Sequence, residues 1–123
     1  MPSLVYRVIG AAMDVYNEWG PGLLEAEYEK ALIYELDQRG ISAESQVEID
    51  ILYKGCDLGN KLRLDLLVED ELIIELKSVE ELKPVHFKQL RTYMKILKKP
   101  IGILMNFNVD DFARGYRVLY SDK

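Results

Sequence analysis

Hydrophobic residues recur at three- and four-residue steps in three segments of the chain, which is the spacing of an amphipathic helix. The first segment covers about residues 4–18, between a helix-starting Pro2-Ser3 and a helix-ending Gly20-Pro21-Gly22. The second covers about 23–39 and is followed by Gly40, which suits a helix end. The third covers about 84–98 and begins with Pro84. The predicted buried stripes are Leu24, Tyr28, Ala31, Leu32 and Leu36 in the second segment, and Phe87, Leu90, Met94 and Leu97 in the third.

Other segments have the patterns of strands. Apolar and polar residues alternate over 46–53, and residues 54–60, with two glycines and an asparagine, predict a turn or short loop. Strands are also predicted at 63–68, 72–77, 101–106 and 116–120, with a turn or short helix at 110–115. Helices precede, interrupt and cover this run of strands, so the predicted class is mixed α/β. A length of 123 residues predicts one domain, residues 1–123.

The strand pair at 63–68 and 72–77 carries the candidate chemistry. Alternation along the second strand places Glu75 and Lys77 on one face, opposite the apolar Leu72, Ile74 and Leu76. If residues 69–71 form a three-residue connection, Val68 pairs with Leu72 and Asp65 lies opposite Glu75, on the same face. A two-residue turn would instead place Asp65 opposite Ile74 and separate the set, so the register is a prediction.

Two carboxylates directly opposite each other repel, and a cation between them relieves the repulsion. Carboxylate oxygens are suitable ligands for Mg²⁺ or Mn²⁺. Lys77, on the same face, could orient or deprotonate an attacking water, so the set suits metal-assisted phosphodiester hydrolysis. The alternative is a solvated strand face that contains an ion pair.

The chain resembles the PD-(D/E)XK, or restriction-endonuclease-like, nuclease superfamily in the pattern of Asp65 and Glu75-x-Lys77. Residues 22–29, Gly-Leu-Leu-Glu-Ala-Glu-Tyr-Glu, resemble the signature of one branch, the GxxExxY protein family. Two further elements resemble the same branch, Gln89-x-x-x-Tyr93 and the late strand that ends in Asn106-Phe107. The resemblance covers about residues 4–120. It implies a three-layer fold with a mixed central β-sheet flanked by helices.

The resemblance also implies roles for individual residues. Asp65 and Glu75 would bind the metal with Glu25 and the backbone carbonyl of Leu76, and Lys77 would act on the water. Gln89 would hold a water or a nucleotide, while Glu29, Tyr93 and His86 would be accessory. The residues alone leave alternatives open. Glu25 also suits the helix dipole, and His86 also suits a hydrogen-bonded structural role.

Composition limits the other function classes. The net charge of −5 counts against a general nucleic-acid coat protein, but residues 77–99 hold seven basic and two acidic side chains, a balance of +5. This basic surface suits phosphate binding and equally suits a solvated helix face. No apolar run approaches the roughly 20 residues that span a membrane, and no secretory signal is visible. A lone Cys56 forms no internal disulfide, so we expect a cytoplasmic protein.

Two functions from different classes therefore remain. The first is a nuclease that uses Mg²⁺ or Mn²⁺ to cleave nucleic acid, DNA rather than RNA. The second is a catalytically silent module of the same fold that binds a protein or nucleic-acid partner; a weaker third is metal or phosphate binding without hydrolysis. No helix-turn-helix or zinc motif selects a DNA site, so we expect a nuclease of this size to need a homodimer or a protein partner for specificity.

Overall fold

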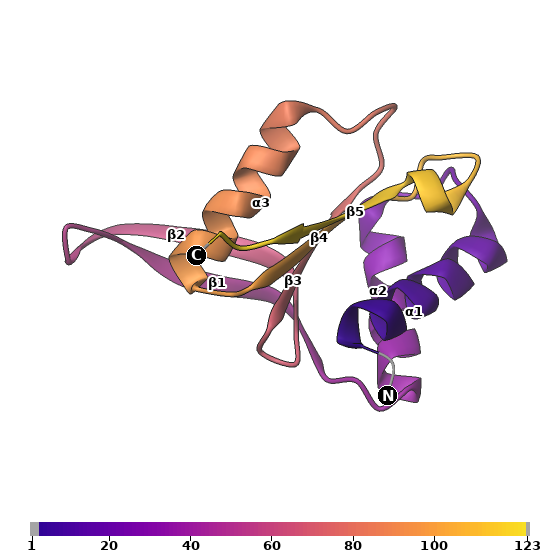
Figure 1. The fold of residues 1–123 in the computed structure, drawn as a ribbon, viewed down its shortest axis with the longest axis horizontal. Coiled ribbons are helices and arrows are strands. Elements are labelled where there is room, and N and C mark those ends of the chain that lie inside the picture. Colours follow the sequence, from indigo (N-terminus) through magenta and orange to yellow (C-terminus); the bar gives the residue numbers. More distant parts are fainter. Residues whose placement is uncertain (1–2, 123) are drawn as a thin grey trace.

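A computed structural model describes residues 3–122, and in this part of the chain five strands form one mixed sheet (Figure 1). The strand order is β1-β2-β3-β4-β5. β3 and β4 run parallel, and the other neighbouring pairs are antiparallel. The strands are β1 (Ala43–Tyr53), β2 (Cys56–Val68), β3 (Leu72–Lys77), β4 (Ile101–Asn106) and β5 (Tyr116–Tyr120), and a short helix, η1 (Phe112–Arg114), precedes β5.

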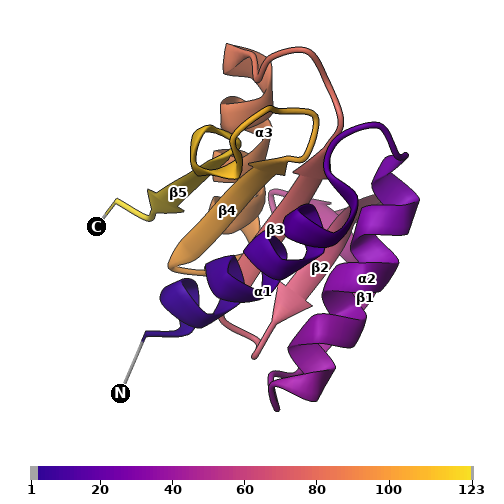
Figure 2. The same cartoon turned by 90° about the vertical axis from the view of Figure 1, so that its right-hand side faces the viewer.

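Helices cover both faces of this sheet. α1 (Leu4–Trp19) and α2 (Glu25–Gln38) lie on one face, and α3 (Pro84–Leu97) lies on the other (Figure 2). Each face has its own core, because Leu66, Ile74 and Leu76 pack with α1 and α2, whereas Leu67 and Ile73 pack with α3. The predicted restriction-endonuclease-like three-layer α/β fold is confirmed.

The helix predictions agree with the structure at most positions. Ser3 caps α1 by accepting the Tyr6 N–H at 3.1 Å, while Pro2 lies outside the described residues. Leu90 and Met94 are buried in the α3 core as predicted. Leu24, in contrast, is 73% exposed, because it precedes the first turn of α2 instead of belonging to its apolar stripe.

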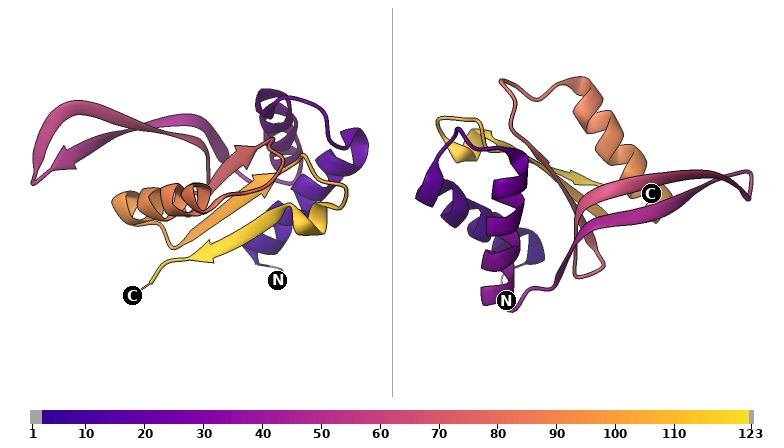
Figure 3. Two further views of the ribbon diagram at one scale, coloured as in Figure 1. Left: turned by 90° about the horizontal axis from the view of Figure 1, so that it is seen from above. Right: turned by 180° about the vertical axis from the view of Figure 1, so that it is seen from behind.

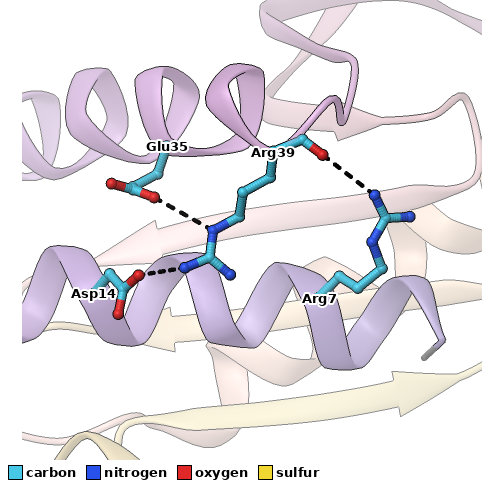
Figure 4. Close-up of polar contacts among 4 residues, drawn as sticks. All are labelled: Arg7, Asp14, Glu35 and Arg39. Atoms are coloured by element: carbon cyan, nitrogen blue, oxygen red, sulfur yellow. Dashed lines mark hydrogen bonds and ion pairs between the residues drawn. The ribbon is translucent and has the colours of Figure 1, made fainter. Parts of the chain in front are cut away.

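A polar link fixes α2 against α1 (Figure 4). Arg39, which follows α2, donates from Nε to Glu35 Oε2 at 3.3 Å and from its terminal nitrogen to Asp14 of α1. The Arg39 carbonyl accepts from the Arg7 guanidinium at 3.4 Å. These contacts join the two helices at the C-terminal end of α2, the opposite end from Glu25.

α3 approaches the sheet closely at Gly102 of β4. A Cβ atom at this position would lie 2.7 Å from Met94 Sδ and 3.0 Å from Leu90 Cδ1. The missing side chain therefore lets the buried stripe of α3 rest on the sheet. No helix among residues 3–122 has the length and apolar character needed to cross a membrane.

The turn between β2 and β3 has the predicted register. Val68 pairs with Leu72, Leu67 with Ile73 and Leu66 with Ile74, so residues 69–71 form the three-residue connection. Glu69 and Asp70 have φ of 52° and 53°, and the Glu71 N–H donates to the Val68 carbonyl at 3.0 Å. A two-residue turn, which would have separated Asp65 from Glu75, is excluded.

The β1–β2 hairpin is longer than the sequence predicted. The predicted loop at 54–60 is wrong: Lys54-Gly55 alone turns the chain, with φ of 51° and 79°, and β2 begins at Cys56. A two-residue turn of this type matches the twist of paired strands. Gly59 instead lies at an irregularity of β2, where the register shifts between Asp50 and Leu52. The far part of the hairpin, residues 50–61, extends beyond the other three strands (Figure 3), and we call it the arm.

Candidate metal and nucleic-acid site

The two predicted acids meet where the backbone pairing of β2 with β3 ends. Beyond the pair Leu66–Ile74, the backbone N–H groups donate to side-chain carboxylates and no longer to the carbonyls of the neighbouring strand. The Asp65 N–H donates to Glu75 Oε2 at 3.0 Å, and the Leu76 N–H donates to Asp65 Oδ2 at 2.8 Å. Each side chain thus binds the backbone of the opposite strand, which brings the two carboxylates together between β2 and β3.

The environment of Glu75 opposes its negative charge. The side chain is 5% exposed, and its pKa rises from an ordinary 4.5 to about 7. Burial is the main cause, followed by repulsion from Asp65, with a smaller contribution from Glu25. The hydrogen bond from the Asp65 amide and the charge of Lys77 act in the opposite direction. Lys77 and Glu25 therefore both lie close enough to influence this carboxylate.

The two acids of α2 lie at the edge of the same site. Glu25 Oε2 accepts the Ser78 N–H at 3.2 Å, directly after β3. Glu29 accepts hydrogen bonds from the Ser45 hydroxyl at 2.7 Å and from the Gln46 amide at 2.9 Å. The same Gln46 nitrogen lies 3.5 Å from Asp65 Oδ1, so one amide links Glu29 to Asp65.

α3 contributes one of its three predicted polar residues directly. Tyr93 is half-buried, and its pKa is raised by burial and by the negative charges of Glu75 and Asp65. Gln89 is exposed and makes no side-chain hydrogen bond within residues 3–122. His86 accepts the Lys83 N–H through Nδ1 at 2.9 Å, so it caps the start of α3 in the structural role that the sequence left open.

Tyr28 of the GxxExxY-like segment is fully buried and holds the loop before α2. Its hydroxyl donates to the Gly20 carbonyl at 2.6 Å and accepts the Leu23 N–H at 3.1 Å. Its ring stacks on Phe107, which follows β4, with ring centres 4.4 Å apart. Tyr28 therefore fixes the chain that leads directly into Glu25.

Several residues at this site were missed by the sequence analysis. Gln46 and Ser78 gave no signal, because isolated polar residues near strand ends are common. Asn106 offered one, since it is a polar residue closing an otherwise apolar strand. It is 2% exposed, and its amide exchanges hydrogen bonds with the backbone of Val79 at 2.9 and 3.1 Å. It therefore orders the loop that follows Lys77.

The donor set fits a hard divalent cation in its chemistry. Asp65 and Glu75 each have one oxygen bound to a backbone amide, while Glu75 Oε1 receives no hydrogen bond within residues 3–122. Oxygen donors that carry excess negative charge suit Mg²⁺ or Mn²⁺. Within the described residues, however, no three acidic, histidine or cysteine side chains converge closely enough to hold an ion.

Comparisons with known proteins give a matching family model and a structure of similar fold. The family model described as the PD-(D/E)XK nuclease superfamily matches residues 2–118. The crystal structure of SSO0001 is similar, with a TM-score of 0.60 at 23% identity, over 80% of this chain and 51% of that chain. This chain thus spans about half the length of SSO0001, and at this identity the likeness shows the fold alone. No curated protein matches the sequence.

Proposed function

The chain belongs to the PD-(D/E)XK nuclease superfamily, and from this premise we propose that it hydrolyses phosphodiester bonds in nucleic acid, DNA rather than RNA, with Mg²⁺ or Mn²⁺. The observation that carries the proposal is the opposed pair of Asp65 and Glu75, with Glu25 and Lys77 close by. A carboxylate whose pKa is raised by burial and by repulsion from a second acid is suited to a cation.

The residues of the site would have separate roles in binding the metal and in acting on the water. Asp65, Glu75, Glu25 and the Leu76 carbonyl would hold the metal, which when bound supplies Lewis-acid stabilisation of charge on the phosphate. Lys77 orients or deprotonates the attacking water from the Glu75 face of β3. Gln89 contacts the water or a nucleotide, Tyr93 positions Lys77 or a phosphate, and Glu29 holds Asp65 in place through Gln46.

The finer assignments belong to the same proposal. We assign the chain to the GxxExxY branch, which is supported by the contacts of Tyr28 before Glu25. We also propose that residues 1–123 act as one domain, located in the cytoplasm, and that a homodimer or a protein partner supplies specificity.

The test is cleavage of labelled oligonucleotides with Mg²⁺ or Mn²⁺, using single-stranded, duplex and branched DNA and the matching RNA. Lys77→Ala should abolish cleavage, because the water loses its activating group, while the circular dichroism spectrum and calorimetric Mn²⁺ binding are retained. Lys30→Ala, which removes an exposed cation from α2, is the matched control and should cleave normally. Cleavage retained by Lys77→Ala would refute the role of Lys77, and no cleavage by the wild type would refute the nuclease.

One observation favours the second function, a silent module that binds a protein or nucleic-acid partner. Asp65 and Glu75 already serve as acceptors for two backbone amides, so the acids have a structural use without any metal. A wild type that binds neither Mn²⁺ nor Mg²⁺, even with an oligonucleotide present, would favour this function over the nuclease.

A further inference from the structure

A basic cavity lies at the C-terminal end of α3. It has a volume of about 600 Å³ and is bounded by α3, the connection from α3 to β4 and the chain that follows β5. Within residues 3–122, the lining contains one acid, Asp122, and four cations, Arg91, Lys95, Lys98 and Lys99. In a protein whose net charge is −5, such a concentration of positive charge in a concave surface indicates an anionic ligand.

The partners of these cations leave most of the charge uncompensated. Lys99 bonds the carboxylate and the carbonyl of Asp70, both at 3.0 Å. Arg91 donates to the Tyr120 carbonyl at 3.4 Å, a contact with a neutral group. Lys95 and Lys98 form no ion pair within residues 3–122.

The helix dipole explains only part of this cluster. Cations at the C-terminal end of a helix are favourable, which accounts for Lys95 in the last turn and for Lys98, the C-cap residue. Arg91 lies more than one turn before the end of α3, and Lys99 lies beyond it. The dipole therefore gives no reason for all four to border one cavity.

The cavity and the carboxylate site lie on opposite flanks of α3. Tyr93 and Arg91 are two residues apart and therefore about 200° apart around the helix. The charges of Glu75 and Asp65 act on Tyr93, whereas Arg91 reaches the carbonyl of Tyr120 at the end of β5. An α-helix with its side chains is about 10–12 Å across. A nucleic-acid strand that crosses α3 from the carboxylates would therefore reach the cavity a few nucleotides from the scissile bond.

We infer that this cavity binds the phosphate backbone of the nucleic-acid substrate, a few nucleotides from the bond that is cleaved. The inference rests on the proposed function and adds a second contact surface to it. The substrate lies across α3, with the scissile phosphate on the Tyr93 flank and a distal phosphate at Arg91, Lys95 and Lys98. These cations act on substrate binding and take no part in the chemistry.

The test compares two triple variants that lose the same charge. Arg91→Gln/Lys95→Gln/Lys98→Gln alters the cavity, and Lys30→Gln/Lys54→Gln/Arg114→Gln alters exposed cations elsewhere. Fluorescence anisotropy would measure binding of a labelled 20-nucleotide single strand, in EDTA to prevent cleavage, between 50 and 200 mM salt. Cleavage of the same strand with Mn²⁺ would then give kcat and KM.

The cavity variant should bind more weakly than the wild type, and the slope of log affinity against log salt should fall by about 2, since each phosphate contact contributes about 0.7 on single strands. KM should rise with little change in kcat, and the control variant should match the wild type. Equal affinity and slope in the two triple variants would overturn the inference while leaving the nuclease intact. If the wild type binds the strand and the cavity variant does not, but none of the single-stranded, duplex or branched substrates is cleaved, the nuclease is refuted and the cavity remains a binding surface for nucleic acid. If the wild type binds none of these substrates, both the nuclease and the inference are refuted.

Discussion

Replacing Glu75 with glutamine should stabilise the metal-free protein at alkaline pH. The folded carboxyl has a pKa of about 7, against an ordinary value of 4.5, because it is buried beside Asp65. Between pH 4.5 and about pH 7, Glu75 therefore keeps its proton in the folded protein and has lost it in the unfolded protein. The favourable contribution is fully present below about pH 4.5 and is lost as the pH rises through about 7.

The size of the effect follows from the same two pKa values. One pKa unit corresponds to about 1.4 kcal/mol, so the difference between 4.5 and about 7 amounts to about 3 kcal/mol as an upper figure. Glutamine has the same shape and no charge, and its carbonyl oxygen can accept the Asp65 N–H in place of Glu75 Oε2. At pH 8 the variant should thus exceed the wild type by up to about 3 kcal/mol in free energy of unfolding, and at pH 5 by much less.

Urea unfolding at pH 5 and pH 8 in EDTA measures this difference directly, with equal m-values as the check that both proteins unfold alike. Glu44→Gln, which removes an exposed carboxylate from β1, is the control and should shift stability by less than about 0.5 kcal/mol. Mn²⁺ at 100 times its dissociation constant should then stabilise the wild type by about 2.7 kcal/mol and leave Glu75→Gln unchanged. A variant less stable than the wild type at pH 8 would refute the reasoning.

Two further predictions concern the surroundings of the site. Tyr28→Phe should lower the free energy of unfolding by about 1–3 kcal/mol, since the Gly20 carbonyl and the Leu23 N–H lose their partner. Urea unfolding measures this against the control Tyr34→Phe, because Tyr34 is 65% exposed. Equal stability of the two variants would contradict the prediction. Backbone amides of the arm should exchange with deuterium faster than those of β3 and β4, because a two-stranded ribbon without a third strand is marginal in water; equal protection in hydrogen-exchange mass spectrometry would contradict this.

The sequence predicted the fold well where one periodicity prevailed. The three- and four-residue steps of α1 and α3 and the apolar run of β4 located these elements. The sequence offered a three-residue or a two-residue turn after Val68, and the structure has the three-residue turn, which places Asp65 against Glu75. The arm was missed because Gly59 and Asn60 are typical of turns, and a single-sequence pattern does not show that a long strand can absorb them as an irregularity. At the site, strand alternation and the family resemblance predicted the pair Asp65 and Glu75, which the structure brings together. Gln46 and Ser78 depend on contacts between distant segments, which no local pattern contains.

The position of the acids within the sheet explains how a small chain can orient a charged site. Each carboxylate uses one oxygen in place of a backbone carbonyl. Oδ2 of Asp65 accepts the Leu76 N–H, and Oε2 of Glu75 accepts the Asp65 N–H. The rigid strands thereby fix the direction of the remaining oxygens, Oδ1 and Oε1, without a dedicated supporting loop. The same arrangement holds two negative groups together in a partly buried place, which costs stability until a positive charge compensates them. A metal that binds the remaining oxygens would recover this cost without breaking either backbone hydrogen bond, so affinity for the cation and strain in the metal-free protein have one structural origin.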